Sequence, residues 1–321
     1  KDIYEILIDP RLVYTINEEL GKKIVKEDQA RMSIFLVAMM RKVANLNPAT
    51  DNLMVNAPSG TGKDYVTEKV FELIPEGEKE EQTRISPKVL GYLKNRRFDK
   101  NVTWHNVALR LEDVPNVVLN DPCFKVMSSA KSNGITKSTI IVKNIPMEYE
   151  IEGKPPIILT IATANPNDEL LRRYPICNLD ESIDQTKEIL KKQANFAEKG
   201  ISTGYDDKII SAQKYMQRIN VKIPYASTLV KIFPTGNLIV RTHFPRFLDY
   251  IKASCALHQY QRKQDESGYY LATDFDYSYA REILMKTTTN PLMIQLTRDQ
   301  QKILEIMKGL ERKPYSVDDL E

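Results

Sequence analysis

A glycine-rich octapeptide is the segment of this sequence whose residue types most directly suggest chemistry. Residues 57–64 read Ala-Pro-Ser-Gly-Thr-Gly-Lys-Asp; they follow a short apolar run and precede a segment with helical spacing. Glycine lets successive backbone N–H groups face one anion, and the start of the following helix adds a partial positive charge. A lysine at the end of such a loop supplies a full charge between the β- and γ-phosphates. The alternative is a glycine-rich loop that binds no nucleotide.

The pattern predicts a triphosphate-binding loop with Mg²⁺ beside it. We expect the nucleotide to be bound by Ala57, Pro58, Ser59, Gly60, Thr61, Gly62, Lys63, Asp64 and Tyr65. Asp64 departs from the usual pattern, in which Ser or Thr gives a hydroxyl to the metal. A carboxylate there can hold Mg²⁺ directly or through water, but it adds negative charge beside the triphosphate. We therefore expect Asp64 to be a metal ligand that either supports or slows turnover.

A pair of adjacent acids, Glu112 and Asp113, follows the apolar residues 107–111. Phosphate transfer needs one acid to hold Mg²⁺ and a second to polarise the attacking water. We assign Glu112 to the metal and Asp113 to the water. Because such sites usually have Asp before Glu, the two roles are interchangeable here. A solvated acidic turn is the alternative.

The composition is that of an ordinary globular chain and gives no global signal for a nucleic-acid partner. The 321 residues include 46 Lys and Arg against 43 Asp and Glu, so any such partner must be bound by local patches. Three distant cysteines and three histidines form neither a disulfide framework nor a zinc site, which suggests reduced thiols and a cytoplasmic protein. The longest apolar run, residues 32–40, is too short to span a bilayer, and we expect no membrane partner.

Hydrophobic spacing predicts an α/β core between helical segments. The expected helical segments are residues 1–50, 64–73, 84–94, 182–262 and 274–285. The expected strands are residues 51–56, 102–111, 138–142, 147–151 and 157–162, with a charged surface loop at 75–81 and a turn at 153–156. Strands that alternate with helices predict a mainly parallel sheet, followed here by an all-helical unit.

The order of these parts resembles the core of the AAA+ ATPases, a P-loop α/β fold in which a parallel sheet lies between helices. The strand at 157–162 leads to Thr-Ala-Asn-Pro, where Asn165 resembles the sensor-1 residue that orients water. Residues 169–175 resemble the segment that carries an arginine finger, so Arg172 or Arg173 is the expected finger. The resemblance implies ATP and Mg²⁺ as cofactors. It also implies an oligomer in which the finger of one subunit reaches the γ-phosphate bound by its neighbour.

Within the AAA+ class the sequence is similar to the minichromosome-maintenance-like (superfamily 6) replicative helicases of plasmids, phages and other mobile elements. The similarity rests on Ile24-Val25 before a buried helix, on the strand pair before sensor 1, and on residues 242–246, where Arg246 is the expected nucleotide contact. It implies a hexameric ATP-driven DNA translocase or helicase that replicates a mobile element, with single-stranded DNA in a central pore. The implied divisions are an N-terminal helical segment (1–50), an ATPase core with a pre-sensor-1 hairpin (51–181), a helical lid (182–290) and the start of a winged helix (291–321).

Four lysines are candidate contacts for nucleic acid, because flexible cations on exposed loops bind phosphates. They are Lys131, Lys137, Lys143 and Lys154. A solvated basic loop is the alternative for the first three, and a simple turn residue for Lys154. The basic residues 94–97 fit a structural surface better than a DNA contact. Two other functions stay open: an AAA+ remodeller or loader of a protein partner, and a nucleotide-binding switch with little turnover.

Overall fold

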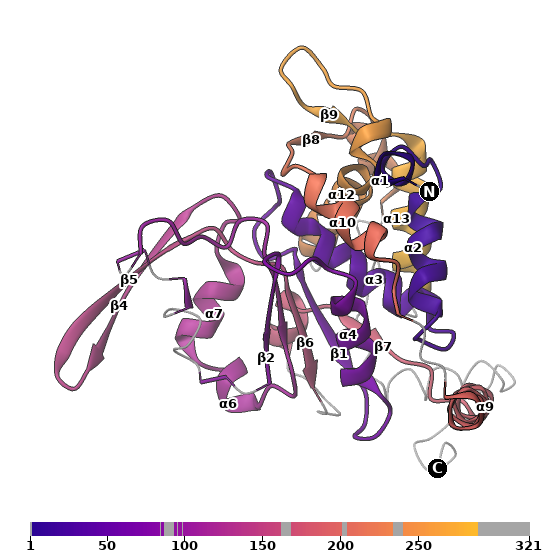
Figure 1. Ribbon diagram of the computed structural model, residues 1–321. Coiled ribbons are helices and arrows are strands. Elements are labelled where there is room, and N and C mark those ends of the chain that lie inside the picture. Colours follow the sequence, from indigo (N-terminus) through magenta and orange to yellow (C-terminus); the bar gives the residue numbers. More distant parts are fainter. Residues whose placement is uncertain are drawn as a thin grey trace, which may run out of the picture.

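The computed structural model describes residues 2–83, 85–86, 93–94, 96–97, 99–161, 168–200, 204–233 and 240–287. Within these residues the centre of the molecule is a five-stranded parallel sheet with the order β2-β3-β6-β1-β7 (Figure 1). Its strands are β1 (Asn52–Asn56), β2 (Lys79–Gln82), β3 (Ala108–Leu111), β6 (Ile157–Ile161) and β7 (Ile176–Asn178). The expected parallel α/β core is confirmed.

The sheet is covered by helices on both faces, and its central strands are apolar for that reason. Successive residues of a strand point to opposite faces, and Met54 and Val55 of β1 accordingly belong to two separate apolar cores. The core around Val55 includes α3 (Asp28–Met39), α4 (Lys63–Glu72), α12 (Val240–Leu257) and α13 (Asp274–Thr287). The core around Met54 includes α6 (Asn116–Leu119), α7 (Pro122–Ser129) and α8 (Asp168–Arg173).

The N-terminal helices pack with the C-terminal ones on the Val55 side of the sheet. α1 (Ile3–Leu7), α2 (Leu12–Gly21) and α3 share their apolar core with α10 (Asp207–Tyr215), α11 (Ala226–Ile232), α12 and α13. α3 is buried almost all round, as its sequence predicts, because it lies between the sheet and α12 and α13. Among the described helices, none combines the length and hydropathy needed to cross a bilayer.

A two-stranded antiparallel hairpin projects from the sheet, on the left in Figure 1. It is formed by β4 (Ile135–Val142) and β5 (Ile145–Glu152), which confirms and lengthens the two strands expected here. Val142 pairs with Ile145, so the turn consists of Lys143 and Asn144 alone. Both turn residues have positive φ, 51° and 61°, as two-residue hairpin turns of the mirror-image type require.

Several elements differ from the sequence-based expectation. Residues 79–81 of the expected charged loop belong to β2, an edge strand whose exposed side requires polar side chains. The expected strand at 102–111 begins only at Ala108. The short parallel pair β8 (Val221–Lys222) and β9 (Tyr270–Leu271) was not expected. The winged-helix segment at 291–321 lies outside the described residues.

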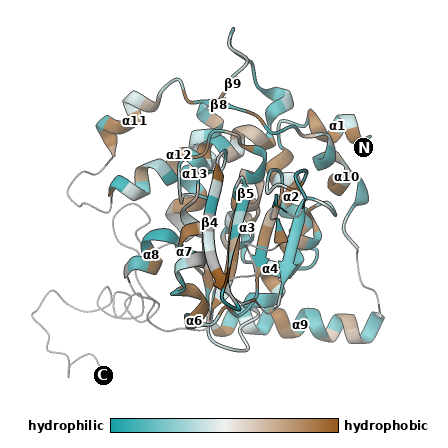
Figure 2. Ribbon diagram, turned by 90° about the vertical axis from the view of Figure 1, so that its left-hand side faces the viewer, coloured by the Kyte–Doolittle hydropathy of each residue, from teal (hydrophilic) through white to brown (hydrophobic). Residues whose placement is uncertain are grey.

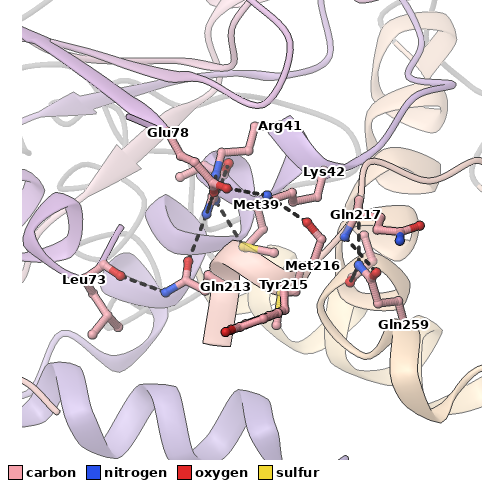
Figure 3. Close-up of polar contacts among 12 residues, drawn as sticks. Met39, Arg41, Lys42, Leu73, Glu78, Gln213, Tyr215, Met216, Gln217 and Gln259 are labelled. Atoms are coloured by element: carbon pink, nitrogen blue, oxygen red, sulfur yellow. Dashed lines mark hydrogen bonds and ion pairs between the residues drawn. The ribbon is translucent and has the colours of Figure 1, made fainter. Parts of the chain in front are cut away.

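A buried polar network joins the 3₁₀ turn η1 (Met40–Lys42) after α3 to α10 and to the segment before β2 (Figure 3). The Glu78 carboxylate accepts hydrogen bonds from Lys42 Nζ at 2.6 Å and from Arg41 Nη2 at 3.0 Å. Arg41 also donates to Gln213 Oε1, and Gln213 Nε2 donates to the Leu73 carbonyl just after α4. Burial lowers the pKa of both Arg41 and Lys42. Glu78 is thus the counter-ion of two buried cations.

Candidate functional site

The glycine-rich loop lies where the sequence places it, between β1 and α4. Gly60 and Gly62 have φ angles of 86° and 88°, a left-handed conformation that glycine adopts without strain. The Thr61 hydroxyl donates to the Pro58 carbonyl at 2.7 Å and tightens the loop. α4 begins at Lys63, so its free N–H groups and partial positive charge face the loop. This arrangement suits the binding of a phosphate chain.

Lys63 lies between two carboxylates. Its Nζ is 3.2 Å from Asp64 Oδ2 and 3.5 Å from Asp113 Oδ1. A buried threonine of β6 joins the same group: the Thr160 hydroxyl donates to Asp64 Oδ1 at 2.5 Å and accepts from the Asp113 N–H at 2.8 Å. The sequence analysis did not identify Thr160. Its one signal is a hydroxyl in an otherwise apolar strand.

The Glu112 carboxylate contacts a neighbouring arginine. Its Oε2 is 3.4 Å from Arg110 Nη1, and Arg110 Nε donates to Glu81 Oε2 on β2 at 2.8 Å. Alternate residues of a strand share a face, so Arg110 and Glu112 lie on the same face as Glu81 of β2, whereas Asp113 turns to Lys63. The structure therefore brings Asp113, rather than Glu112, to the loop lysine. Of the two interchangeable assignments, the geometry favours Asp113 for the metal.

The donor atoms beside Lys63 fit Mg²⁺. Asp64 and Asp113 supply carboxylate oxygens, hard donors of the kind that Mg²⁺ prefers, and the Lys63 ammonium already places a cation between them. No cluster of three or more His, Cys, Asp or Glu exists among the described residues. Phosphate and water oxygens would thus complete the coordination, as is usual for this ion. Bound there, Mg²⁺ would neutralise charge on the β- and γ-phosphates.

A cavity of about 910 Å³ extends from the glycine-rich loop to the exposed helix α9 (Ile183–Lys199). Figures 1 and 2 show α9 below α4, apart from the helices that cover the sheet. The volume of the cavity is within the range of small-molecule and cofactor sites. The lining groups are the loop (Gly60, Thr61, Gly62), α4 (Tyr65, Val66, Lys69), residues before α3 (Lys22, Lys23, Ile24, Val25, Glu27) and the α9 side (Leu179, Asp180, Gln185, Ile189, Lys192, Gln193, Asn195, Phe196, Lys199).

Hydrogen bonds join the segment before α3 to the α9 side of the cavity, through side chains that the sequence analysis did not identify. Gln185 Nε2 donates to the Val25 carbonyl at 2.9 Å, and Glu27 Oε1 accepts from the Asp180 N–H at 2.8 Å. Burial raises the pKa of Glu27 to about 7, although its bond to Asp180 N–H acts in the opposite direction. Arg31 Nη1 donates to the Ile24 carbonyl at 3.0 Å. These contacts fix the wall opposite the glycine-rich loop.

A family model described as the MTBMA_p00010 P-loop domain matches residues 1–222. The chain belongs to this family. The matched range includes the loop, Asp113, Thr160 and both walls of the cavity. Membership in this P-loop family indicates a nucleotide-binding NTPase, a class that usually works with Mg²⁺. The comparison with curated proteins found no match.

The two candidate finger arginines of this P-loop protein lie near the amino ends of the strands, whereas the glycine-rich loop lies at their carboxyl ends. Arg173 donates to the Lys125 carbonyl at 2.6 Å and to Ser129 Oγ at 2.8 Å, whereas the Arg172 side chain is exposed. Asn52, which begins β1, donates to the Arg173 carbonyl at 3.3 Å. At about 3.3 Å per strand residue, β1 separates this end from the loop by roughly 17 Å. Neither arginine reaches the loop of its own chain.

Arg246 also lies away from the loop. It is buried, with Nη2 donating to the Arg172 carbonyl at 2.9 Å and Nη1 3.4 Å from His243 Nδ1. Burial lowers its pKa to about 10. The structure therefore does not support the expected contact between Arg246 and a nucleotide bound to the same chain. Asn165 and the rest of the sensor-1 segment lie outside the described residues.

The candidate lysines for nucleic acid fall into two groups. Lys131, Lys137 and Lys143 are exposed, with Lys143 in the hairpin turn. The prediction that Lys154 contacts nucleic acid is wrong. Its side chain is buried, and Nζ binds Asp51 Oδ1 at 2.5 Å and Asn52 Oδ1 at 2.8 Å. The chain turns at Gly153 back towards β6, which carries Lys154 into the core rather than to a hairpin tip.

The basic residues at 94–97 have structural partners where they are described. Arg96 Nη1 forms an ion pair with Glu152 Oε2 at 2.9 Å, and Arg97 forms one with Glu148. Both acids belong to β5, so these arginines anchor the segment before β3 to the hairpin. These ion pairs are in line with the expected structural surface.

Proposed function

We propose that this protein is an AAA+-type ATPase in which Lys63, Asp64 and Asp113 bind ATP together with Mg²⁺. Lys63 turns from the two carboxylates to the β- and γ-phosphates, and Asp64 and Asp113 then hold the metal. Glu112 is left to polarise the attacking water, assisted by Asn165 according to the family resemblance. Support comes from the strand order, in which β6 separates the strand of the glycine-rich loop from the strand of the acids.

The ATPase works as an oligomer, with a hexameric ring as the form that the resemblance suggests. Arg172 is the finger: its side chain is exposed and its carbonyl is held by Arg246, whereas the Arg173 guanidinium is already bound within the chain. Arg172 lies at the opposite end of the strands from its own loop. The nucleotide site that it can complete is therefore that of a neighbouring subunit. Arg246 stabilises the backbone of Arg172 through its hydrogen bond to the Arg172 carbonyl.

The work done by ATP hydrolysis is the translocation or unwinding of DNA during replication of a mobile element. The observation that carries this proposal is Lys143, exposed in the two-residue turn of a hairpin that projects from the ATPase core. Lys137 lies on the same hairpin and Lys131 precedes it. Cations at this position could hold the phosphates of a single strand in a central pore.

A protein remodeller is the second candidate, and one observation favours it. Ile141 and Ile145 flank the turn and are 69% and 63% exposed, which gives the hairpin an apolar end, visible in Figure 2. Exposed apolar side chains at such a position suit a polypeptide as well as nucleotide bases. A third candidate is a nucleotide-binding switch, in which Asp64 holds the nucleotide but suppresses hydrolysis.

The test is the ATPase rate with no addition, with single-stranded DNA, with duplex DNA and with an unfolded polypeptide. We expect single-stranded DNA to raise the rate and Lys143→Glu to remove that increase while the basal rate persists. Lys214→Glu, an equal charge change on the exposed side of α10, should leave the increase intact. Stimulation by the polypeptide alone would favour the remodeller. Tight ATP binding without turnover would favour the switch.

A further inference from the structure

The Thr160 hydroxyl contacts both acidic residues beside Lys63, the carboxylate of Asp64 and the backbone of Asp113. β6 lies between β1 and β3, and Thr160 pairs with Val55 in the strand that leads to the glycine-rich loop. Its hydroxyl has a single hydrogen, which it donates to Asp64 Oδ1 at 2.5 Å. A lone pair of the same oxygen accepts the Asp113 N–H at 2.8 Å. One side chain thus fixes the P-loop acid relative to the acid of the neighbouring strand.

The backbone of Asp113 depends on Thr160 for its position. Asp113 has a positive φ of 45°, an uncommon conformation for a residue other than glycine. Two consecutive N–H groups hold it there: that of Asp113 donates to Thr160 Oγ1, and that of Val114 donates to the Thr160 carbonyl at 3.0 Å. This conformation directs the Asp113 carboxylate towards Lys63 rather than towards Arg110.

We propose that Thr160 is the positioning residue of the metal site: its hydroxyl orients Asp64, the carboxylate that stands where the glycine-rich loop usually has a hydroxyl. The inference rests on the proposed ATP and Mg²⁺ site. The usual loop has Ser or Thr after the lysine; here that residue is Asp64, whose carboxylate is held by a hydroxyl from β6. Thr160 keeps Asp64 and Asp113 on either side of the Lys63 ammonium. When Lys63 turns to phosphate, both acids are already oriented to hold a divalent cation.

A purely structural role for Thr160 predicts something different. The side chain is fully buried, so its methyl group packs in the sheet whatever its hydroxyl does. Loss of the hydroxyl would then lower stability without changing how nucleotide binding responds to metal. The positioning role predicts that the response to metal changes while metal-free nucleotide binding persists. These two outcomes can be measured separately.

The experiment is calorimetric titration of a non-hydrolysable ATP analogue into the full chain, with excess EDTA and with saturating Mg²⁺. For Thr160→Val, which keeps the shape, we expect a similar affinity in EDTA but a loss of about tenfold or more in the gain that Mg²⁺ gives. Thr160→Ser, which keeps the hydroxyl, should restore most of that gain. Thr67→Val is the matched control: Thr67 is also fully buried, but its hydroxyl donates to the Asp64 carbonyl within α4. It should leave the Mg²⁺ response unchanged.

A compensating variant separates an effect on the metal site from a general effect on stability. Asp64→Thr returns the usual hydroxyl to the loop, and in this background Thr160→Val should reduce the Mg²⁺ response far less than it does in the parent. Thr160→Ala provides the same comparison should the valine variant not fold. An unchanged Mg²⁺ response in Thr160→Val, or an equal loss in both backgrounds, would overturn the positioning role alone. A parent protein that binds no analogue in either condition would overturn the proposed ATPase itself, and this inference with it.

Discussion

The ammonium of Lys63 lies 3.5 Å from the carboxylate of Asp113, although the two residues are far apart in the sequence. The contact exists because the strand before Lys63 and the strand before Asp113 are separated in the sheet by β6 alone, so their carboxyl ends lie close together. It distinguishes Asp113 from its neighbour Glu112, whose carboxylate is directed to Arg110. The two acids should therefore differ in how their loss affects the protein.

Asp113→Asn and Glu112→Gln are expected to have separable effects. Asp113→Asn removes a charge beside Lys63, so it should weaken the Mg²⁺-dependent part of nucleotide binding. Glu112→Gln should leave that binding intact and lower kcat by about a hundredfold, the size of a lost general base. Nucleotide titrations with and without Mg²⁺, together with steady-state ATPase rates, check both. The opposite pattern would return Glu112 to the metal and Asp113 to the water.

Arg172 and Arg173 should also separate. Arg172→Ala should leave stability and ATP binding intact and reduce hydrolysis by about a thousandfold, as loss of an arginine finger does. Arg173→Ala removes hydrogen bonds to Lys125 and Ser129, and should lower the thermal midpoint of unfolding.

Subunit mixing tests whether the finger acts between chains. A mixture of Lys63→Ala and Arg172→Ala proteins should recover part of the ATPase activity, because some interfaces then combine an intact loop with an intact finger. No recovery in mixtures that form the oligomer would contradict the intersubunit role of Arg172.

Glu78→Gln should destabilise the fold strongly. Arg41 and Lys42 are buried, and Glu78 is the carboxylate that neutralises them (Figure 3). Breaking a buried ion pair from one side lowers the free energy of unfolding by about 3–5 kcal/mol. Denaturant unfolding of the variant measures this, with Glu76→Gln as the control because the Glu76 side chain is 85% exposed. A loss under about 1 kcal/mol would show that the two cations are instead well solvated by water.

Glu27 predicts a pH dependence of stability with a definite sign. Burial raises its pKa to about 7 in the folded protein, from an ordinary value of 4.5 for glutamate. The folded state therefore binds more protons than the unfolded state between these values, and this contribution to stability is lost as pH rises from about 4.5 to about 7. Glu27→Gln removes the titration but keeps an acceptor for the Asp180 N–H. The variant should gain stability relative to the parent as pH rises from about 5 to about 8. A constant difference in unfolding midpoint would contradict the assignment.

The sequence was informative where chemistry is local and less so where it depends on packing. The glycine-rich loop could be predicted because its backbone conformation and its lysine are specified by adjacent residues. The roles of Glu112 and Asp113 could not, because they depend on Arg110 and on the turn after β3. Thr160 and Lys154 acquire their partners only when β6 and β1 pair. β2 was taken for a loop because an edge strand can be as charged as one.

The most direct measurement is calorimetric titration of ATP into the full chain in the presence of Mg²⁺, alongside the Lys63→Ala variant. The cavity and the loop predict one ATP per chain with a dissociation constant in the micromolar range, and a loss of about a hundredfold or more when Lys63 is replaced. Absence of binding at millimolar ATP, or equal binding by the two proteins, would contradict the nucleotide site on which the account depends.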